Sequence, residues 1–293
     1  MKYRALIRDC PLGELNTWGS GGRCLWLAAP SSVAEALSLI AEAREEGTRL
    51  YLLGGGSNVL VQDGLLSAGV ISTSALTSIK LTEAGGAMAA EVEAGLPVRR
   101  LLALSMEKNL GGLAFLTGIP GTVGGALHGN AGADGESFAP LVDGIETISR
   151  DGALRVWSRE ELRWSYRASP WSEDPLMITK AWLRLPFDDK DNIIKNIRYF
   201  AELKKGQPIG AKTAGCVFKN PPGASAGRLL DNCGCKELAV GGAVISPRHA
   251  NFIENRGGAS SRNIYDLAEI CRKRVFERYG ITLEYEVKFF GTF

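Results

Sequence analysis

The sequence predicts a globular chain that mixes helices and strands and is long enough for about two domains. Of its 293 residues, 45% are apolar and 23% are charged, the balance of a chain that buries a core and is not disordered. At roughly 150 residues per domain, this length allows two domains. Apolar residues follow helical spacing at 33–41 and then form a short strand-like run at 50–53, so helix and strand alternate early in the chain.

The first elements have recognisable start and stop signals. Ser31 or Ser32 can cap a helix, and Glu35 completes a capping box; the helical spacing continues to Gly47. Strands with turns are expected over 66–95. Pro97 then suits the first turn of a helix that stops at Gly111-Gly112.

A segment without charged residues follows, from Asn109 to Ala133, with eight glycines and Pro120. A membrane-spanning helix needs about 20 mostly apolar residues, but glycine and proline here would weaken any helix. We therefore interpret this segment as buried and non-helical.

The second half predicts a hairpin around Asp151-Gly152 and then a short helix opened by a capping box of Ser158 and Glu161. The remaining expected elements are a strand at 177–187, a linker at 188–191, helices at 192–205, 226–232 and 262–278, and strands at 243–245, 251–253 and 281–288.

Charge and cysteine usage exclude several classes of protein. The 34 basic and 32 acidic residues nearly cancel, so no overall field attracts nucleic acid or an acidic membrane. Residues 1–13 hold no signal-peptide core. Six cysteines without a Cys-x-x-Cys pair, and only two histidines, predict no metal site and a reducing, cytoplasmic location.

Two glycine clusters, 54–58 and 118–125, can expose backbone N–H groups to a phosphate. The dinucleotide fingerprint fits poorly, because Val59 stands at its third glycine and no acid follows about 20 residues later. The phosphate loop has a near miss at 206–213, where Ala211 and Pro208 break the pattern. Phosphate binding is indicated, but by neither common motif.

Taken in order, the motifs of this chain resemble those of the UDP-N-acetylenolpyruvoylglucosamine reductases. The resemblance runs from about residue 16 to 291 and is to the shorter subtype, which lacks a tyrosine-bearing insert. The matching segments are Leu-Gly-Gly-Gly-Ser-Asn-Val-Leu at 53–60, Gly-Ile-Pro-Gly-Thr-Val-Gly-Gly at 118–125, Gly-Asn-Ala-Gly-Ala at 129–133, Tyr-Arg-Ala-Ser at 166–169, Thr-Ala-Gly-Cys-Val-Phe-Lys-Asn-Pro at 213–221 and Leu-Glu-Tyr-Glu-Val at 283–287.

The resemblance implies an α+β chain with the FAD-binding fold of the vanillyl-alcohol-oxidase-like (PCMH-type) flavoenzymes and a separate α+β substrate-binding domain. On that layout, FAD-binding subdomain 1 covers 1–72 and subdomain 2 covers 73–203, completed by 281–293. The substrate-binding domain covers 204–280.

The implied reaction reduces the enolpyruvyl ether of a UDP-sugar to a lactyl ether, giving UDP-N-acetylmuramate for peptidoglycan. NADPH is the co-substrate and reduces FAD, which passes a hydride to the terminal alkene carbon and leaves an enolate to be protonated. The implied FAD-binding residues are Leu53, Gly54, Gly55, Gly56, Ser57, Asn58, Val59, Leu60, Gly118, Ile119, Pro120, Gly121, Thr122, Gly124, Gly125, Asn130, Gly132 and Ala133.

Three residues are implied as catalytic. Arg167 offers a permanently charged, planar guanidinium for the carboxylate and enolate. Glu286 would need a pKa raised by burial in order to assist an anion. Cys216 stands where the family usually has a serine proton donor; a thiol with an ordinary pKa of about 8.5 is a far stronger acid than an alcohol.

The implied substrate contacts are Tyr166, Lys219, Asn220, His249 and Asn251, in a chain expected to act as a monomer on small molecules. Two other functions stay open on the sequence. A flavin oxidase of the same fold would explain the glycine loops, and a non-catalytic nucleotide-binding relative would explain the serine-to-cysteine change.

Overall fold

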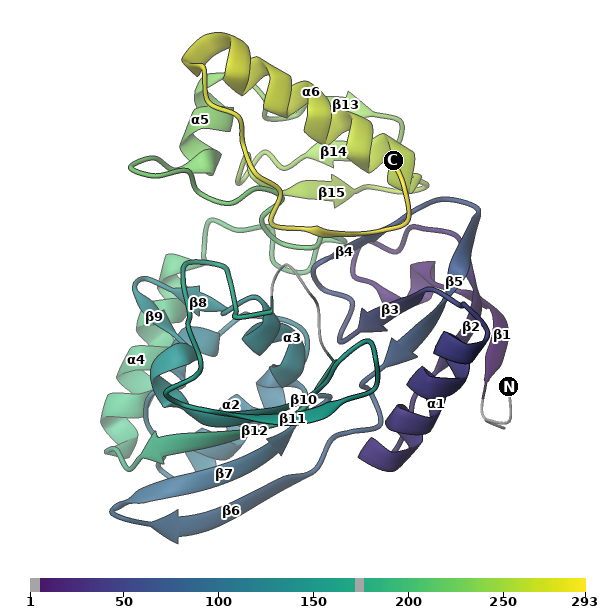
Figure 1. The fold of residues 1–293 in the computed structure, drawn as a ribbon. Helices are drawn as coiled ribbons and strands as arrows, with labels where there is room; N and C mark the ends of the chain where they lie inside the picture. Colours follow the sequence, from purple (N-terminus) through teal and green to yellow (C-terminus); the bar gives the residue numbers. More distant parts are fainter. Residues whose placement is uncertain (1–5, 172–176) are drawn as a thin grey trace. The chain divides into compact units, whose positions relative to one another are not determined.

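The computed structural model describes residues 6–171 and 177–293 (Figure 1). Of these, a first compact unit holds Leu6, Leu27–Gly55 and Gly69–Lys204, and a second holds Ile7–Trp26, Gly56–Ala68 and Lys205–Phe293. Two strands, β2 (Arg23–Ala28) and β5 (Leu65–Ser72), begin in the second unit and end in the first. Residues 1–5, part of the segment searched for a signal peptide, lie outside the described residues.

The first unit is built around an antiparallel sheet in the order β11-β10-β12-β7-β6. The hairpin expected around Asp151-Gly152 is confirmed, because Ile145 pairs with Trp157 across it. The bounds of these strands are β6 Ile79–Ala84, β7 Ala87–Glu93, β10 Val142–Ile148, β11 Leu154–Ser158 and β12 Met177–Pro186.

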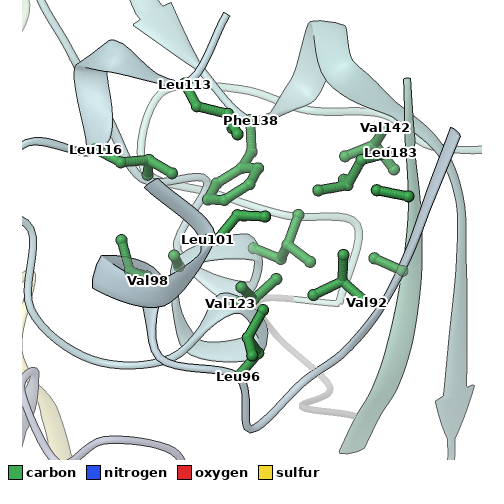
Figure 2. Packing of buried hydrophobic residues seen from close by; sticks show 14 of the residues in the cluster. Val92, Leu96, Val98, Leu101, Leu113, Leu116, Val123, Phe138, Val142 and Leu183 are labelled. Atoms are coloured by element: carbon green, nitrogen blue, oxygen red, sulfur yellow. The ribbon is translucent and has the colours of Figure 1, made fainter. Parts of the chain in front are cut away.

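Helices cover one face of this sheet and close the core of the first unit. They are α2 (Val98–Glu107), α3 (Val123–His128) and α4 (Lys190–Leu203). Strand residues alternate, so that Val92 and Leu183 point into the core while their neighbours do not. Figure 2 shows Phe138 among Leu101, Leu113 and Leu116. The centroids of the Phe138 and Phe115 rings are 5.5 Å apart, and the two rings are perpendicular.

The glycine-rich segment is buried as expected, but the expectation that it has no helix is wrong. It contains the 3-10 turn η2 (Ala114–Leu116) and the helix α3. The Thr122 side chain caps α3 by accepting from the Gly125 N–H at 3.4 Å. Packing of Val123 and Leu127 against the sheet offsets the low helix propensity of glycine.

The rest of the first unit begins with α1 (Val33–Glu45), whose expected cap is confirmed: Ser32 Oγ accepts from the Glu35 N–H at 3.2 Å. Strand β3 (Leu50–Leu53) pairs in parallel with β5. The short elements are β8 Gly132–Ala133, β9 Glu136–Ser137 and η3 Ala139–Leu141. The prediction of a helix after Ser158 is wrong. The Glu161 carboxylate accepts from the Ser158 N–H at 2.8 Å, as in a capping box, but the segment forms only a turn.

The second unit packs helices on a small antiparallel sheet, β13-β14-β15. Helix α6 (Ser261–Tyr279) contacts β13, β14 and β15 and the helix α5 (Ala226–Asn232). It has the expected cap at Ser260 and ends at Gly280, whose φ is +67°. The strands are β13 Ala239–Val240, β14 Ala243–Ile245 and β15 Ile253–Asn255; the N-terminal elements of this unit are β1 Ile7–Pro11 and η1 Gly13–Leu15.

The closing segment differs from the expected strand over 281–288. Only β16 (Lys288–Phe290) is a strand, and it pairs in parallel with β4 (Val59–Val61), not with a strand of 73–203. The expected alternation survives in the burial, because Leu283 and Val287 are buried while Glu284 is exposed. Within 281–287, strand pairing is limited to an isolated bridge between Tyr285 and Phe218. Among the helices of residues 6–171 and 177–293, none combines the length and the hydropathy of a transmembrane span.

Candidate active site

The two glycine clusters meet in the first unit. A Cβ atom added to Gly55 would lie 2.6 Å from the Gly121 Cα, and one added to Gly54 would lie 2.8 Å from the Thr122 Oγ1. Any side chain at these glycines would push the two loops apart. Segments about 65 residues apart in sequence therefore form one backbone surface, as the phosphate hypothesis requires.

The second glycine loop is fixed to the residues that directly follow β7. The Val123 N–H donates to the Leu96 carbonyl at 2.9 Å, and the Gly124 N–H donates to the Ala94 carbonyl at 2.8 Å. A Cβ atom on Gly124 would lie 2.6 Å from the Ala94 Cβ, so this close approach also needs glycine. Main-chain hydrogen bonds to Ala94 and Leu96 thus fix the position of the second glycine loop.

Several buried polar atoms of the first unit have no hydrogen-bond partner among the described residues. Among them are Thr73 Oγ1, Thr117 Oγ1 and Asn130 Oδ1. Buried polar atoms are seldom left unsatisfied, so these three fit contacts to the polar groups of a ligand. Together with the glycine surface, they fit a bound dinucleotide such as FAD.

Arg167 lies at the tip of a tight turn in the first unit. Ser165 and Ala168 exchange main-chain hydrogen bonds of 3.2 Å, and Arg167 between them has a φ of +53°. The Arg167 guanidinium donates to the Gly132 carbonyl at 3.2 Å, and the Asn130 side chain donates to the Ser165 carbonyl at 2.9 Å. The structure therefore brings the arginine motif onto the 129–133 segment.

Tyr166 precedes this arginine and is 57% exposed. The Arg167 Cζ lies 5.5 Å from the centre of the Tyr166 ring, within reach of a cation–π interaction. The aromatic ring thus covers one side of the guanidinium.

Lys204 is a residue of this unit that the sequence analysis missed. Its ammonium donates to the Phe115 carbonyl at 3.2 Å and to the Thr117 carbonyl. Burial and then the charge of Arg167 lower the pKa of Lys204 to about 8. The positive charges of Lys204 and Arg167 therefore act on each other within the first unit. A lysine directly after a helix gave no sequence signal.

Cys216 lies in the second unit, in a segment held by Asn251. The Val217 N–H donates to the Asn251 carbonyl at 2.9 Å. The Asn251 side chain accepts from the Phe218 N–H at 2.9 Å and donates to the Phe218 carbonyl at 2.8 Å. Asn251 is 2% exposed, and Gly215 before the cysteine has a φ of +80°. The turn at Gly215 and the two hydrogen bonds of the Asn251 side chain therefore fix the backbone of Cys216.

Glu286 lies beside this segment in the same unit. The Glu286 N–H donates to the Val217 carbonyl at 2.8 Å, next to Cys216. The Asn58 side chain donates to the Glu286 carbonyl at 3.1 Å, and the Lys288 N–H donates to the Asn58 carbonyl at 3.0 Å. The structure thus brings together the backbones of the expected proton donor, the expected glutamate and the end of the first glycine cluster.

Basic side chains flank Glu286. Lys219 is ion-paired with the exposed Glu284 at 3.3 Å. The pKa of Lys288, which the sequence analysis did not single out, is lowered by burial and then by Lys219, while Glu286 acts to raise it. Asn220 accepts from the Ala226 N–H at 2.9 Å and so holds the start of α5.

His249 is half-buried against α5. A Cβ atom on Gly227 would lie 2.7 Å from the His249 Cε1. The centroids of the His249 and Phe252 rings are 4.9 Å apart. The His249 Nδ1 accepts from the Asn251 N–H at 3.2 Å. Burial and then Lys236 lower the pKa of His249, so the neutral ring is favoured.

The expected residues are divided between the two units. Arg167 is in the first unit, and Cys216 and Glu286 are in the second. In the first cluster, Gly54 belongs to the first unit, while residues 56–60 belong to the second. There, a Cβ atom on Gly56 would lie 1.9 Å from the Leu15 carbonyl oxygen, so glycine is required again.

Two families match separate stretches of this chain. Residues 25–158 match the FAD binding domain family, and residues 207–290 match the C-terminal domain family of UDP-N-acetylenolpyruvoylglucosamine reductase. These stretches contain both glycine clusters and the segments of Cys216 and Glu286 respectively.

Whole-chain relatives carry the same name. The chain is 38% identical over 287 residues to a UDP-N-acetylenolpyruvoylglucosamine reductase of Geobacter metallireducens, covering 98% of this chain and 94% of that protein. It is 39% identical over 285 residues to one of Rubrobacter xylanophilus, covering 97% and 94%.

Solved structures agree. The UDP-N-acetylenolpyruvylglucosamine reductase of Thermus caldophilus matches with a TM-score of 0.80 and 33% identity, covering 98% of each chain. A pollen protein described as Phl p 4.0202, a glucose dehydrogenase, matches 65% of this chain and 43% of its own with a TM-score of 0.51 and 17% identity, a likeness of fold alone.

Proposed function

This chain belongs to the UDP-N-acetylenolpyruvoylglucosamine reductase family, and from that premise we propose how its residues share the reaction. The chain has the α+β FAD-binding fold and is an FAD-dependent oxidoreductase with NADPH as co-substrate. It reduces UDP-N-acetylglucosamine enolpyruvate to UDP-N-acetylmuramate in peptidoglycan precursor synthesis. The observation that carries the site assignment is the contact between the two glycine clusters in the first unit.

We propose that FAD is held by the backbone of residues 53–60 and 118–125 and by the 129–133 segment. Support comes from the glycine contacts and from the unsatisfied Thr73 Oγ1, Thr117 Oγ1 and Asn130 Oδ1 atoms of the first unit. When bound, FAD supplies the hydride that it has taken from NADPH. The protein's part is to place the substrate, stabilise the charge that develops and deliver a proton.

Arg167 is proposed to bind the carboxylate of the enolpyruvyl group. Reduction adds a hydride to the terminal alkene carbon, and the former double-bond electrons move onto the carbon beside the carboxylate as an enolate. A guanidinium presents paired N–H donors and permanent positive charge to those oxygens. The bonds of Asn130 and Gly132 to the Arg167 turn support a fixed position for that charge.

Cys216 is proposed to donate the proton that completes the reaction. The thiol proton moves to the enolate carbon, and the resulting thiolate is reprotonated from water. The two hydrogen bonds between the Asn251 side chain and the Phe218 main chain support this role, because they restrain the backbone next to Cys216. A thiol is acidic enough to transfer its proton at neutral pH.

Glu286 is proposed to act in its acid form beside the enolate. Its main-chain bonds to Val217 and Asn58 place it next to the segment of the proton donor. A carboxyl group in this role must keep its proton near pH 7, which desolvation by the bound substrate would favour.

The substrate residues divide into two kinds. We propose that Tyr166, Lys219 and Asn220 contact the UDP-sugar, and the exposed Tyr166 ring and the Lys219 ammonium support this. His249 accepts from the Asn251 N–H, and the Asn251 side chain donates to the Phe218 carbonyl. We therefore propose that His249 and Asn251 support the wall of the sugar site.

We further propose a monomeric, cytoplasmic enzyme that serves cell-wall growth, and hence cell shape and division. None of the six cysteines, all of which lie among the described residues, is in a disulfide, which supports a reducing compartment. The three-part division at 72/73 and 203/204 stays a proposal; in support of its second boundary, the second compact unit resumes at Lys205, just after α4. The pairing of β16 with β4 attaches the closing residues to the 56–68 segment.

An anaerobic bleaching experiment tests the function. The purified protein should be yellow, NADPH should bleach it, and the enolpyruvyl UDP-sugar should restore the colour with one lactyl product per flavin. Recovery with oxygen but not with the sugar would indicate the flavin oxidase alternative. A protein that NADPH does not bleach would be either an oxidase, whose flavin an alcohol would reduce, or the non-catalytic relative, whose flavin neither would reduce.

A further inference from the structure

Lys204 holds the turn that leads into the second glycine cluster. Its ammonium bonds the Phe115 carbonyl at 3.2 Å and the Thr117 carbonyl, on either side of Leu116. The Leu116 carbonyl itself accepts from the Ile119 N–H at 2.9 Å. Three consecutive carbonyls at the entrance of the cluster are therefore bonded, two of them by one lysine.

The contact continues into the loop itself. Gly118 has a φ of +71°, and a Cβ atom on it would lie 3.3 Å from the Lys204 Cδ. The Lys204 side chain thus packs along the loop, while its ammonium reaches the carbonyls. Since α4 packs against η2, the lysine links a rigid helix to a glycine loop that has little stiffness of its own.

We infer that Lys204 is a positioning residue for the FAD-binding loop: its ammonium sets the conformation of 115–121, and so the affinity for FAD. This inference rests on the proposed assignment of the second glycine cluster to FAD. Charged donors bond carbonyls about twice as strongly as neutral ones, so loss of the charge loosens the loop.

The surroundings make this bond sensitive to pH. Burial and Arg167 lower the pKa of Lys204 to about 8. No Asp, Glu, Lys or Arg occurs from 109 to 133, so η2 and the loop offer no other charge. On α4, the positions three and four residues earlier are Ala201 and Phe200. After β8, the Asp134 carboxylate accepts from Tyr199.

The test measures FAD release from the diluted full-length holoenzyme by the rise of flavin fluorescence. The Kd of the unaltered enzyme should rise between pH 7 and 9, as the Lys204 ammonium loses its proton. Lys204→Met should raise the Kd about tenfold or more at pH 7 and remove this pH dependence. Lys204→Arg should keep the pH 7 affinity within about threefold and flatten the profile, because guanidinium does not titrate there. Lys195→Met, at an exposed site on α4, is the matched control and should change nothing.

Gly121→Ala distinguishes a failure of the Lys204 role from a failure of the assignment of the loop to FAD. Its φ of +99° and its closeness to Gly55 mean that alanine should disrupt the loop and release FAD. If this variant loses FAD while Lys204→Met binds as tightly as the unaltered enzyme, the role of Lys204 is refuted and the loop assignment stands. If both bind normally, the loop assignment fails as well. Equal losses in Lys204→Met and Lys204→Arg, both with the pH slope retained, would reduce Lys204 to a packing residue.

Discussion

The Asn58 side chain donates to the main-chain carbonyl of Glu286 at 3.1 Å, and Asn58 in turn accepts from the Lys288 N–H at 3.0 Å. The end of the first glycine cluster and the segment of the expected catalytic glutamate are therefore joined directly, although 228 positions separate them. A residue that resembles a cofactor contact thus also sets the backbone of a residue that resembles a catalytic one.

Removal of this bond should impair turnover more than folding. Asn58→Ala loses one hydrogen bond, worth about 1 kcal/mol, and frees the Glu286 backbone. We expect kcat of the FAD-saturated enzyme to fall about tenfold. Gln62→Ala is the control, because that amide bonds the Leu65 carbonyl and the Thr292 N–H instead. Equal kcat values for the two variants would contradict the link.

Replacements of Cys216 separate proton donation from hydride delivery. A general acid contributes about 10²–10⁴-fold, so Cys216→Ala should lose at least about a hundredfold in kcat while NADPH still bleaches the flavin at the normal rate. Cys216→Ser should keep activity within about tenfold. Stopped-flow absorbance separates the two half-reactions. Cys233→Ala, at a thiol that donates to the Arg274 carbonyl, is the control. Full activity of Cys216→Ala would remove this thiol from the mechanism.

The neighbouring glutamates provide a matched pair. Glu286→Gln removes the proposed acid and should lower kcat by about two orders of magnitude. Glu284→Gln breaks only an ion pair with Lys219, in which the Glu284 side chain is 76% exposed, so its effect should stay within about twofold. Steady-state kinetics with the enolpyruvyl UDP-sugar decide the matter. If both variants behave alike, Glu286 is one more surface carboxylate of the closing segment.

His249 should make the enzyme less stable in mild acid. Burial lowers its pKa in the folded chain below the unfolded value of about 6.5, so the unfolded state binds more protons in that window. The free energy of unfolding should therefore fall as the pH drops below about 6.5. Urea titrations at pH 5, 6 and 7 on the unaltered chain and on His249→Gln test this. An identical pH slope in both would contradict the assignment to this histidine.

Elements with local signals could be predicted from the sequence. Helices α1 and α6 begin at Ser32 and Ser260, because a capping hydroxyl and helical apolar spacing act within a few residues. The glycine clusters were recognisable for the same reason, since their chemistry lies in the backbone. The α4 helix was displaced by two residues, because Asp189 caps it and the expected start was 192.

Features that depend on a distant partner could not be predicted. Residues 281–287 alternate like a strand but lack a continuous neighbour to pair with, and 123–128 form a helix only because a sheet covers their apolar side. Asn251 was expected as a substrate contact, and that its amide also bonds Phe218 is visible only in the structure.

The sequence by itself therefore determined the family, the cofactor and the residue types of the chemistry, since these follow from ordered short motifs. Only the tertiary structure decided that Gly55 packs on Gly121, that Asn58 holds Glu286 and that Lys204 bonds the loop at Thr117. Each of these contacts joins segments tens to hundreds of residues apart. Hydrogen bonds and close packing depend on position in space, which local spacing along a chain does not encode.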